Sequence, residues 1–584
     1  MRTPEAVLAA AVALILGGGL LAWSIQTGGG AVEVRDVRWV APSGTGMSGL
    51  LYIPEGATVE NPAPGILAVH GYINSRETQA GFAIEFARRG YVVLALDQTG
   101  HGYSDPPAFA EGFGGPAGLR YLRSLEFVDT TNVGLEGHSM GGWAASAAIA
   151  AHPDGYRSTV LAGSSPGAFG APAGSPEEPR NLGLIWSRWD EFSQTMWASA
   201  VPSDVRRGER LKAVFGTVED VEPGRLYGSI EEGTGRMLFE PRTNHPGDHL
   251  SPTAIGNAVQ WFQTTLEGGN DLPPSNQIWY WKEIGTLLAA VGMILLLFPV
   301  GTILLRSSYF SALREPPAPS RARAGTGWWV AAVLTAALGP LTLFPFKDLP
   351  TVIGWAPGPV FPQSITNSVI AWTTVLGLAT IALFVVWHAM QNRHAAGSRD
   401  AYGLTWGGRV LWRRIAKSLL LAFLIVLTGY ASLAVTDYLF TVDFRFWVFA
   451  IKPMSPLQLR MALVYLIPLA FYFIVLNVVL FGQLRRDEWS ARRAMLVNLG
   501  VLVLGWVVLY VVQYAPLLAG GTMTIADEPL WTIIAYQLLP LMMIAGLVLT
   551  YFNRRTGHVY VGGFVAAMLV TWIVVASQAT HYAA

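Results

Sequence analysis

Long runs of apolar residues constrain this chain more than any other feature. Roughly the first 25 residues, and nearly all of the chain after about residue 278, are apolar over lengths that can cross a bilayer as a helix. The stretch between them has the mixed composition of a globular domain. The 584-residue chain is 52% hydrophobic and only 13% charged, far to the apolar side of an average soluble protein. We therefore predict one part that folds in lipid and one that folds in water.

The first run, residues 6–25, has no charged residue and follows Arg2. We predict an uncleaved anchor rather than a signal peptide, because no clean small-residue cleavage site follows the run. Eight further spans are predicted after Trp279, which gives about nine transmembrane helices in total. Their expected limits are roughly 281–305, 328–346, 366–390, 416–440, 460–482, 494–515, 530–551 and 559–578.

Arginine alternates between the connections that join these spans. The first, third, fifth and seventh connections are rich in arginine, whereas the others carry few cations. Because cation-rich loops stay in the cytoplasm, the pattern predicts a cytoplasmic N-terminus and an extracytoplasmic segment before the second span. The arginines on which this orientation rests are Arg2, Arg306, Arg314, Arg321, Arg323, Arg393, Arg399, Arg409, Arg413, Arg414, Arg485, Arg486, Arg492, Arg493, Arg554 and Arg555.

Three domains are predicted: an N-terminal transmembrane anchor at 1–29, an extracytoplasmic domain at 30–275 and a polytopic membrane domain of about eight helices at 276–584. In the middle domain, short β-rich runs alternate with helical runs, which predicts a mostly parallel sheet with helices on both faces. The expected strands lie near 32–40, 49–53, 64–70, 91–96, 132–136, 157–162, 211–215 and 236–240, and the expected helices near 78–89, 116–127, 140–151 and 252–266.

A glycine-flanked serine lies between a predicted strand and a predicted helix. Gly137-His138-Ser139-Met140-Gly141 follows one strand directly and opens the next helix. Glycines on both sides of the serine permit the sharp turn of a G-x-S-x-G nucleophile elbow, which lifts the hydroxyl above the sheet. The alternative is a tight turn whose serine has no chemical role. The strand before the motif and the helix after it favour a nucleophile.

Two further motifs make a resemblance to one family specific. The sequence His-Gly-Tyr at 70–72 ends the third predicted strand, and Asp-Gln-Thr-Gly-His-Gly-Tyr-Ser at 97–104 follows the fourth. Together with the elbow, these motifs resemble the α/β-hydrolase superfamily over roughly residues 45–267. The resemblance implies an α/β-hydrolase fold, a serine hydrolase activity, and an oxyanion hole made by the backbone N–H groups of Tyr72 and Met140.

A serine nucleophile needs a base to take its proton and a carboxylate to orient that base. In the superfamily both follow the serine in sequence. The segment Phe-Gly-Thr-Val-Glu-Asp-Val-Glu-Pro at 215–223 resembles the strand end that carries the acid, which points to Glu219, with Asp220 as the alternative. His245 is the predicted base from its spacing to the closing helix, and His249 is the alternative.

The resemblance also predicts a cap at about 164–210, where the superfamily inserts its lid. Large apolar side chains recur there at helical spacing. They either line an acyl pocket or pack the cap on the sheet, and packing is favoured. These residues are Trp186, Trp189, Phe192, Met196 and Trp197.

Composition excludes several other classes of function. The formal net charge is zero and no basic block is present, so nucleic-acid binding is not expected. The absence of cysteine excludes thiol catalysis, cysteine-ligated zinc and disulfides. No metal-binding constellation or cofactor motif is evident, so neither is predicted. The expected partners are the lipid bilayer and a small-molecule, lipid or peptide acyl substrate, and nothing in the sequence indicates a protein partner.

The combined prediction is a membrane-anchored serine hydrolase that cleaves an ester, thioester or amide through an acyl-enzyme. One alternative is an acyltransferase, which would use the same triad. Another is a transporter or permease with an accessory hydrolase domain, although ionisable groups at mid-membrane are scarce. Amides within the spans are predicted to bond between helices; they are Asn477, Asn498, Gln513 and Gln537.

Overall fold

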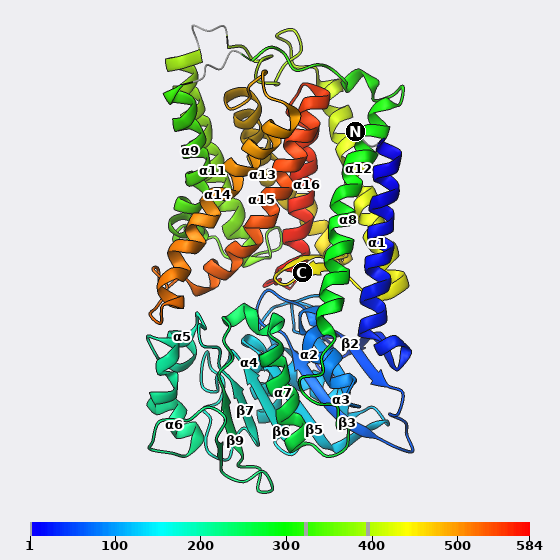
Figure 1. Ribbon diagram of the computed structural model, residues 1–584, viewed down its shortest axis with the longest axis vertical. Coiled ribbons are helices and arrows are strands. Elements are labelled where there is room, and N and C mark those ends of the chain that lie inside the picture. The colour runs from blue at the N-terminus through cyan, green and yellow to red at the C-terminus, as the bar shows by residue number, and fades with distance from the viewer. Residues whose placement is uncertain (1–2, 321–324, 393–396, 584) are drawn as a thin grey trace.

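The computed structural model describes residues 3–320, 325–392 and 397–583, without the side chains of residues 391 and 392. A sheet-containing domain lies at one end of the molecule and a bundle of long helices at the other (Figure 1). Four arginines used to predict the orientation lie outside the described residues: Arg2, Arg321, Arg323 and Arg393.

The large sheet is parallel at its centre and antiparallel at both edges. In the described chain its strand order is β1-β2-β4-β3-β5-β6-β7-β9-β8. The pairs β1–β2, β2–β4 and β8–β9 are antiparallel, and the other neighbours are parallel. The strands are β1 (Val32–Val40), β2 (Gly46–Pro54), β3 (Ala63–Val69), β4 (Val92–Asp97), β5 (Val128–His138), β6 (Ser158–Ala162), β7 (Leu182–Ile185), β8 (Leu226–Tyr227) and β9 (Arg236–Phe239), and a separate hairpin consists of β10 (Phe444–Phe446) and β11 (Phe449–Ile451).

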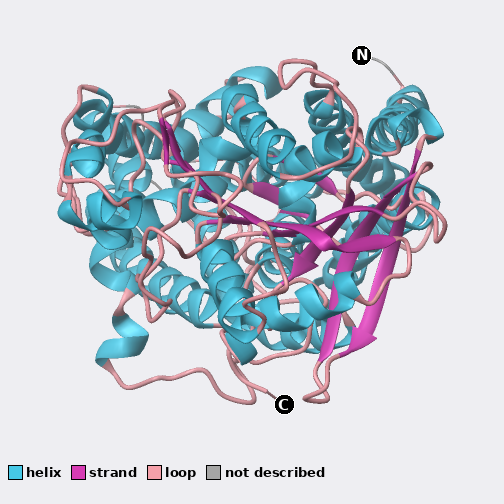
Figure 2. Ribbon diagram, turned by 90° about the horizontal axis from the view of Figure 1, so that it is seen from below, coloured by secondary structure: helices cyan, strands magenta, loops and turns pink. Residues whose placement is uncertain are grey.

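Helices cover both faces of this sheet. The helices α2 (Ala80–Ala87) and α7 (Pro252–Thr265) pack on one face, and α3 (Gly115–Arg123) and α4 (Met140–Ala151) pack on the other. The central strands β3 and β4 are buried along their whole length, as expected of strands covered on both sides. Figure 2 shows the twist of the strands from the end of the molecule that carries the sheet. The predicted α/β-hydrolase fold class is confirmed.

Nine helices of the described chain are long and apolar enough to span a bilayer. Each coincides with a predicted span, which confirms the predicted number and indicates a multi-pass membrane protein. They are α1 (Pro4–Gln26), α8 (Trp279–Arg306), α9 (Thr326–Lys347), α11 (Ser364–Trp387), α12 (Trp412–Phe440), α13 (Pro456–Val478), α14 (Ala491–Leu518), α15 (Pro529–Thr556) and α16 (Tyr560–Ser577).

The helices α1 and α8 flank the sheet domain in sequence and pack side by side in space (Figure 1). A Cβ atom on Gly18 would lie 2.5 Å from the carbonyl oxygen of Gly285, and a Cβ atom on Gly285 would lie 2.7 Å from that of Gly18. A Cβ atom on Gly292 would lie 2.9 Å from the carbonyl oxygen of Ala11. Glycines thus allow the close backbone approach that drives helix association where lipid supplies no hydrophobic force.

Three of the four amides predicted to bond between helices do so, each to a side chain of a neighbouring helix. Such bonds satisfy polar groups that lipid cannot solvate. The pairs are Asn477 with Asn553 (3.0 Å), Asn498 with Thr550 (2.8 Å) and Gln513 with Thr532 (2.8 Å).

A buried ionic cluster joins the sheet domain to the β10–β11 hairpin of the membrane part. Arg445 on the hairpin lies 2.5 Å from Asp443 and 3.4 Å from Glu77 of the sheet domain. Lys452 lies 3.6 Å from the same Glu77 carboxylate. Burial alone would raise the pKa of Glu77, but Lys452, Arg76 and Arg445 hold it well below its usual value. This cluster fixes the hairpin over the carboxyl end of the sheet.

One predicted strand is a helix. Residues 211–215 lie in α6 (Glu209–Phe215), which ends at Gly216 with a φ of 65°. The strand beside β6 is instead β7, which lies inside the segment predicted to be the cap. The predicted cap limits of 164–210 are corrected accordingly, because the insertion follows β7 and contains α5 (Ser193–Trp197) and α6. With four residues, β7 is too short to show an alternating or extended apolar pattern.

Candidate active site

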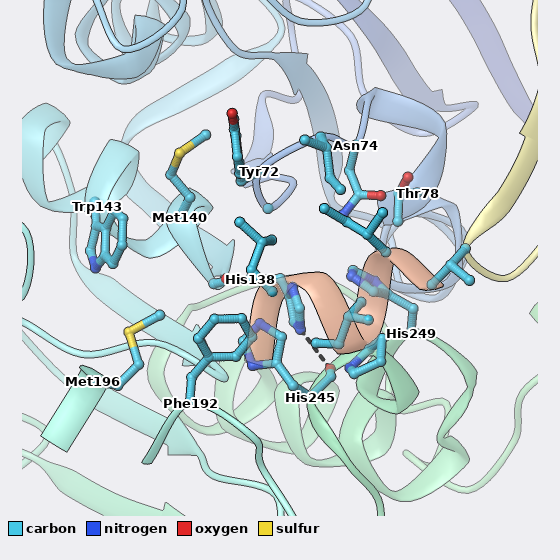
Figure 3. A pocket seen from close by; sticks show the side chains of 18 of the residues that line it. Tyr72, Asn74, Thr78, His138, Met140, Trp143, Phe192, Met196, His245 and His249 are labelled. Carbon is cyan, nitrogen blue, oxygen red and sulfur yellow. Dashed lines mark hydrogen bonds between the residues drawn. The ribbon is translucent and has the colours of Figure 1, made fainter. Parts of the chain in front are cut away.

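A cavity of about 470 Å³ lies between the carboxyl end of the sheet and the helical bundle. Its floor comes from several segments of the sheet domain: the loops after β3, β4 and β6, the turn between β5 and α4, the insertion after β7 and the loop before α7. Its roof consists of Trp447 and Val448 of the hairpin and of Leu530, Ile533, Ile534 and Gln537 of α15. Figure 3 shows the side chains that converge on this cavity.

Ser139 lines the floor in a strained backbone conformation. Its φ is 55° and its ψ is −122°, and α4 begins at the next residue. A Cβ atom on Gly137 would lie 2.4 Å from the backbone of Gly141, and one on Gly141 would lie 2.0 Å from the carbonyl oxygen of Val69. The two glycines are therefore required by the turn that holds the serine, as the elbow motif predicts.

His245 lines the same cavity and pairs with a carboxylate that the sequence analysis missed. Its Nδ1 donates to Asp190 Oδ2 at 2.9 Å, and the Asp190 side chain is fully buried. This bond leaves Nε2 of His245 as the nitrogen that can accept a proton. Burial lowers the pKa of His245, which favours the neutral imidazole. Gly163 lies against the His245–Asp190 pair. A Cβ atom there would lie 2.8 Å from His245 Nδ1 and 3.2 Å from Asp190 Oδ2.

The backbone of His245 is held from both sides. Its N–H donates to Glu191 Oε2 at 2.9 Å, and its carbonyl oxygen accepts from His138 Nε2 at 3.0 Å (Figure 3). Glu191 Oε1 in turn accepts from the hydroxyl of Tyr514 on α14 at 2.6 Å and from Asn244 Nδ2 at 2.8 Å. Burial and the neighbouring Asp190 raise the pKa of Glu191 to about 7. A membrane helix therefore contributes to the position of the histidine.

The alternative base, His249, also lines the cavity. Its ring lies against that of His138, with 4.1 Å between centroids. Both ring nitrogens of His249 are buried without a hydrogen-bond partner in the described part of the chain. Burial, with the neighbouring His138, lowers its pKa well below the usual value. His249 lacks the carboxylate that would hold its tautomer, whereas His245 has one.

Neither predicted acid contacts His245. Glu219 and Asp220 are exposed in the loop after α6, where Asp220 lies 3.3 Å from Lys212 and 3.6 Å from Arg207. The prediction of Glu219, with Asp220 as its alternative, is therefore corrected, since the carboxylate beside His245 belongs to Asp190. The error follows from the strand assignment, because the acid of this arrangement follows β7 and the resembling segment at 215–223 follows a helix.

The two expected oxyanion residues line the same cavity as Ser139. Tyr72 and Met140 both line the cavity, and a Cβ atom on the intervening Gly71 would lie 3.1 Å from Ser139 Cβ. The Tyr72 side chain turns away to the C-terminal tail, where its hydroxyl lies 2.9 Å from His581 Nε2. The backbone N–H of Ser364 donates to Nδ1 of His581 at 3.3 Å, so Nε2 carries the proton and donates to Tyr72. This contact fastens the loop after β3.

Comparison with known proteins agrees with this geometry. The family model described as alpha/beta hydrolase fold matches residues 64–211. The sheet domain belongs to the α/β-hydrolase superfamily. No curated protein matches the sequence of the chain.

Several solved structures match part of the chain. An esterase from Pyrococcus furiosus is 18% identical over 41% of this chain and 94% of its own, with a TM-score of 0.29. Carboxyl esterase 2 from Tuber melanosporum is 16% identical over 41% of this chain and 87% of its own, also with a TM-score of 0.29. A hypothetical protein from Pseudomonas aeruginosa is 26% identical over 23% of this chain, which spans 43% of that protein, with a TM-score of 0.21.

The apolar residues expected in the cap of the hydrolase divide among three environments. Phe192 and Met196 line the cavity. Trp186 and Trp197 are buried in the core of the insertion, as the packing interpretation predicts. Trp189 packs against the cluster of Tyr514, Leu517 and Met523 in the membrane part.

Two features of the hydrolase site were missed from the sequence. For Asp190, the available signal was the short apolar run Leu182–Ile185, which ends five residues before it. The roof had no such signal, because Ile533 and Ile534 on α15 have the composition of any lipid-facing residue. Within the described residues, no group of three or more His, Cys, Asp or Glu side chains is arranged to hold a metal ion.

Proposed function

We propose that this protein is a membrane-anchored serine hydrolase in which Ser139 is the nucleophile, His245 the general base and Asp190 the carboxylate that orients the base. The observation that carries the proposal is the buried 2.9 Å contact of His245 with Asp190, in the cavity that Ser139 also lines. The strained φ of 55° at Ser139 supports it, since residues with such a backbone conformation cluster at functional sites.

The chemistry follows from these positions. Ser139 Oγ attacks the carbonyl carbon of an ester, thioester or amide while His245 Nε2 takes its proton. Asp190 stabilises the resulting imidazolium, and the N–H groups of Tyr72 and Met140 donate to the oxyanion. His245 then gives its proton to the leaving group, which leaves an acyl group on Ser139. Water, activated by the same histidine, releases the acid and restores the hydroxyl.

The hydrolase domain is proposed to lie outside the cytoplasm, with the N-terminus inside. The described arginine-rich connections that follow α8 and α15 lie at the end of the bundle away from the sheet (Figure 1). The rule that such connections stay in the cytoplasm supports this orientation.

The test is labelling of the full-length protein in membranes by a fluorophosphonate probe. Ser139→Ala is expected to abolish labelling. His245→Ala and Asp190→Asn are expected to slow it by roughly 10⁴-fold or more, as found when a triad member is lost. Glu219→Gln is the matched control for Asp190→Asn, because its carboxylate is exposed and remote from His245.

The outcomes separate the possible assignments. Slow labelling in His249→Ala together with normal labelling in His245→Ala would move the base to His249. A defect in Glu219→Gln equal to that of Asp190→Asn would remove the basis for choosing Asp190. Wild-type protein that is folded and never labels would refute the serine hydrolase itself.

A further inference from the structure

A second, smaller cavity in the helical bundle adjoins the active-site cavity. The two share Ile534 and Gln537 on α15. The second cavity has a volume of about 70 Å³ and lies among α9, α11, α13, α14, α15 and α16. Its lining on α15 extends from Ile534 to Met542, which corresponds to about 12 Å of helix rise. The path from Ser139 thus leads toward the middle of the bundle and is narrow.

The walls of this narrow cavity are mainly hydrocarbon and aromatic, and its polar lining residues are Thr335, Thr373, Thr380, Gln537 and Gln578. Trp372 and Trp506 lie with their ring centroids 6.0 Å apart, and none of the described lining residues is charged. The hydroxyls of Thr335 and Thr373 donate to carbonyl oxygens of their own helices at 2.7 and 2.8 Å. These threonines therefore have their hydroxyl donors satisfied, and the cavity suits an apolar chain.

A third cavity adjoins the narrow one and lies nearer the outside of the bundle. It has a volume of about 310 Å³, lies mainly between α9 and α11, and shares Thr335, Leu338 and Thr380 with the narrow cavity. Its outer residues Val330 and Val386 are 50% and 54% exposed. On a helix that spans a bilayer, such apolar side chains face lipid tails. The three cavities therefore lie one after another between the lipid-facing side of α9 and α11 and the site of Ser139.

We propose that the membrane domain binds the hydrocarbon tail of a long-chain acyl ester that enters from the bilayer between α9 and α11. The tail lies in the narrow cavity while the ester carbonyl lies at Ser139. This inference rests on the proposed serine hydrolase. When Ser139 Oγ bonds to the acyl carbon, the bond from that carbon to the alcohol oxygen breaks, and the alcohol takes the proton from His245. Water then cleaves the acyl-enzyme to the carboxylic acid, and the tail occupies the same cavity throughout.

The first experiment measures chain-length preference with the full-length protein in detergent micelles. The substrates are p-nitrophenyl acetate, butyrate, octanoate and palmitate, which share one leaving group. Each methylene buried from water is worth up to about fourfold in kcat/KM. We expect kcat/KM to rise at least about tenfold from butyrate to palmitate.

Variants that fill the narrow cavity test its role directly. Leu538→Trp on α15 and Val369→Trp on α11 are expected to lower the palmitate-to-butyrate ratio at least about tenfold, because the indole occupies the space of the tail. Met543→Trp is the matched control, since Met543 is 47% exposed on the same helix and outside the cavity lining. It is expected to keep the wild-type ratio. Fluorophosphonate labelling of each variant shows that the site is folded.

The route of entry is tested in vesicles. Protein in phosphatidylglycerol vesicles is given p-nitrophenyl palmitate either within its own bilayer or in separate protein-free vesicles. Faster hydrolysis from its own bilayer supports lateral entry, and equal rates would overturn it. Labelled, active protein with no chain-length preference, or with the same ratio in all three tryptophan variants, would overturn the tail-binding site while leaving the hydrolase. Loss of labelling in the wild type would instead refute the proposed function.

Discussion

At the scale of single residues, the burial of His245 has a direct consequence for pH dependence. Burial lowers the pKa of this imidazole, with Glu191 and Asp248 opposing part of the shift. Only the neutral ring can take the proton of Ser139, and below the pKa the ring is protonated. We therefore expect kcat/KM for a neutral ester to stay level from neutral pH downward and to fall only when pH drops through this lowered pKa, below the usual value of about 6.5.

The measurement is a pH profile of kcat/KM, which reports groups of the free enzyme. His249→Ala is the comparison, since burial lowers the pKa of His249 well below its usual value and keeps the ring neutral over this range. The midpoint of the acid limb is expected to be the same in this variant. A midpoint clearly above 6.5 would contradict the environment described for His245.

The residues of the candidate site differ in how far the sequence predicts them. Ser139 carries its own local signal, because the flanking glycines are needed for the turn that holds it. His245 follows from its position before the last helix. For Asp190 the only local signal is the short apolar run before it, since its role depends on a four-residue strand and on a histidine 55 positions later. Long-range pairing of this kind is decided by the packed fold and not by nearby residues.

At the scale of elements, the β10–β11 hairpin determines how the hydrolase domain meets the bundle. Arg445 is almost fully buried, and its guanidinium faces Asp443 and Glu77. Removing one member of a buried ion pair leaves uncompensated charge and costs about 3–5 kcal/mol. We expect Arg445→Met to lower the midpoint of thermal unfolding in detergent. The midpoint is measured from the loss of fluorophosphonate labelling on heating.

The control for this variant is Arg35→Met. Arg35 pairs with Glu33 at 2.6 Å, but both side chains are more than half exposed. An exposed pair contributes at most about 1 kcal/mol, so its loss is expected to change the midpoint little. Equal shifts in the two variants would show that the buried cluster does not stabilise the junction.

Elements with a strong period or length signal agree between sequence and structure, and short irregular ones do not. All nine long helices were predicted because a bilayer sets their length and composition. The helix α6 was predicted as a strand and the strand β7 was not predicted, because seven or four residues are too few to separate a strand from a helix by pattern. Tertiary pairing with β6 and β9 decides that β7 is a strand.

At the scale of the whole molecule, the chain has no cysteine, so its orientation can be read from single introduced thiols. Glu60 is exposed on the hydrolase domain, and Ser308 is exposed in the connection after α8. We expect Glu60→Cys to react with a membrane-impermeant maleimide in intact cells, and Ser308→Cys to react only after permeabilisation. The reverse pattern would contradict the proposed orientation.

The roof of the active site has no counterpart in the sequence analysis. Trp447 donates its indole N–H to the carbonyl oxygen of Pro246 at 2.6 Å, across a separation of about 200 positions in the chain. Its neighbours in the roof come from α15, whose apolar residues look the same whether they face lipid, another helix or a substrate. The composition of a helix shows whether it lies in lipid or in water. It does not show which face of the helix closes a cavity.

The parts of the active site are synthesised at different times, and the roof is made last. A ribosome completes the sheet, the elbow and the loop that carries His245 well before it makes the hairpin, α14 or α15. Until those later segments fold, Phe192 and Met196 have no membrane helix opposite them, and Glu191 lacks its bond from Tyr514. A chain that stops before these segments therefore lacks the roof over Ser139 and His245. The roof is complete only after the chain has been made through α15.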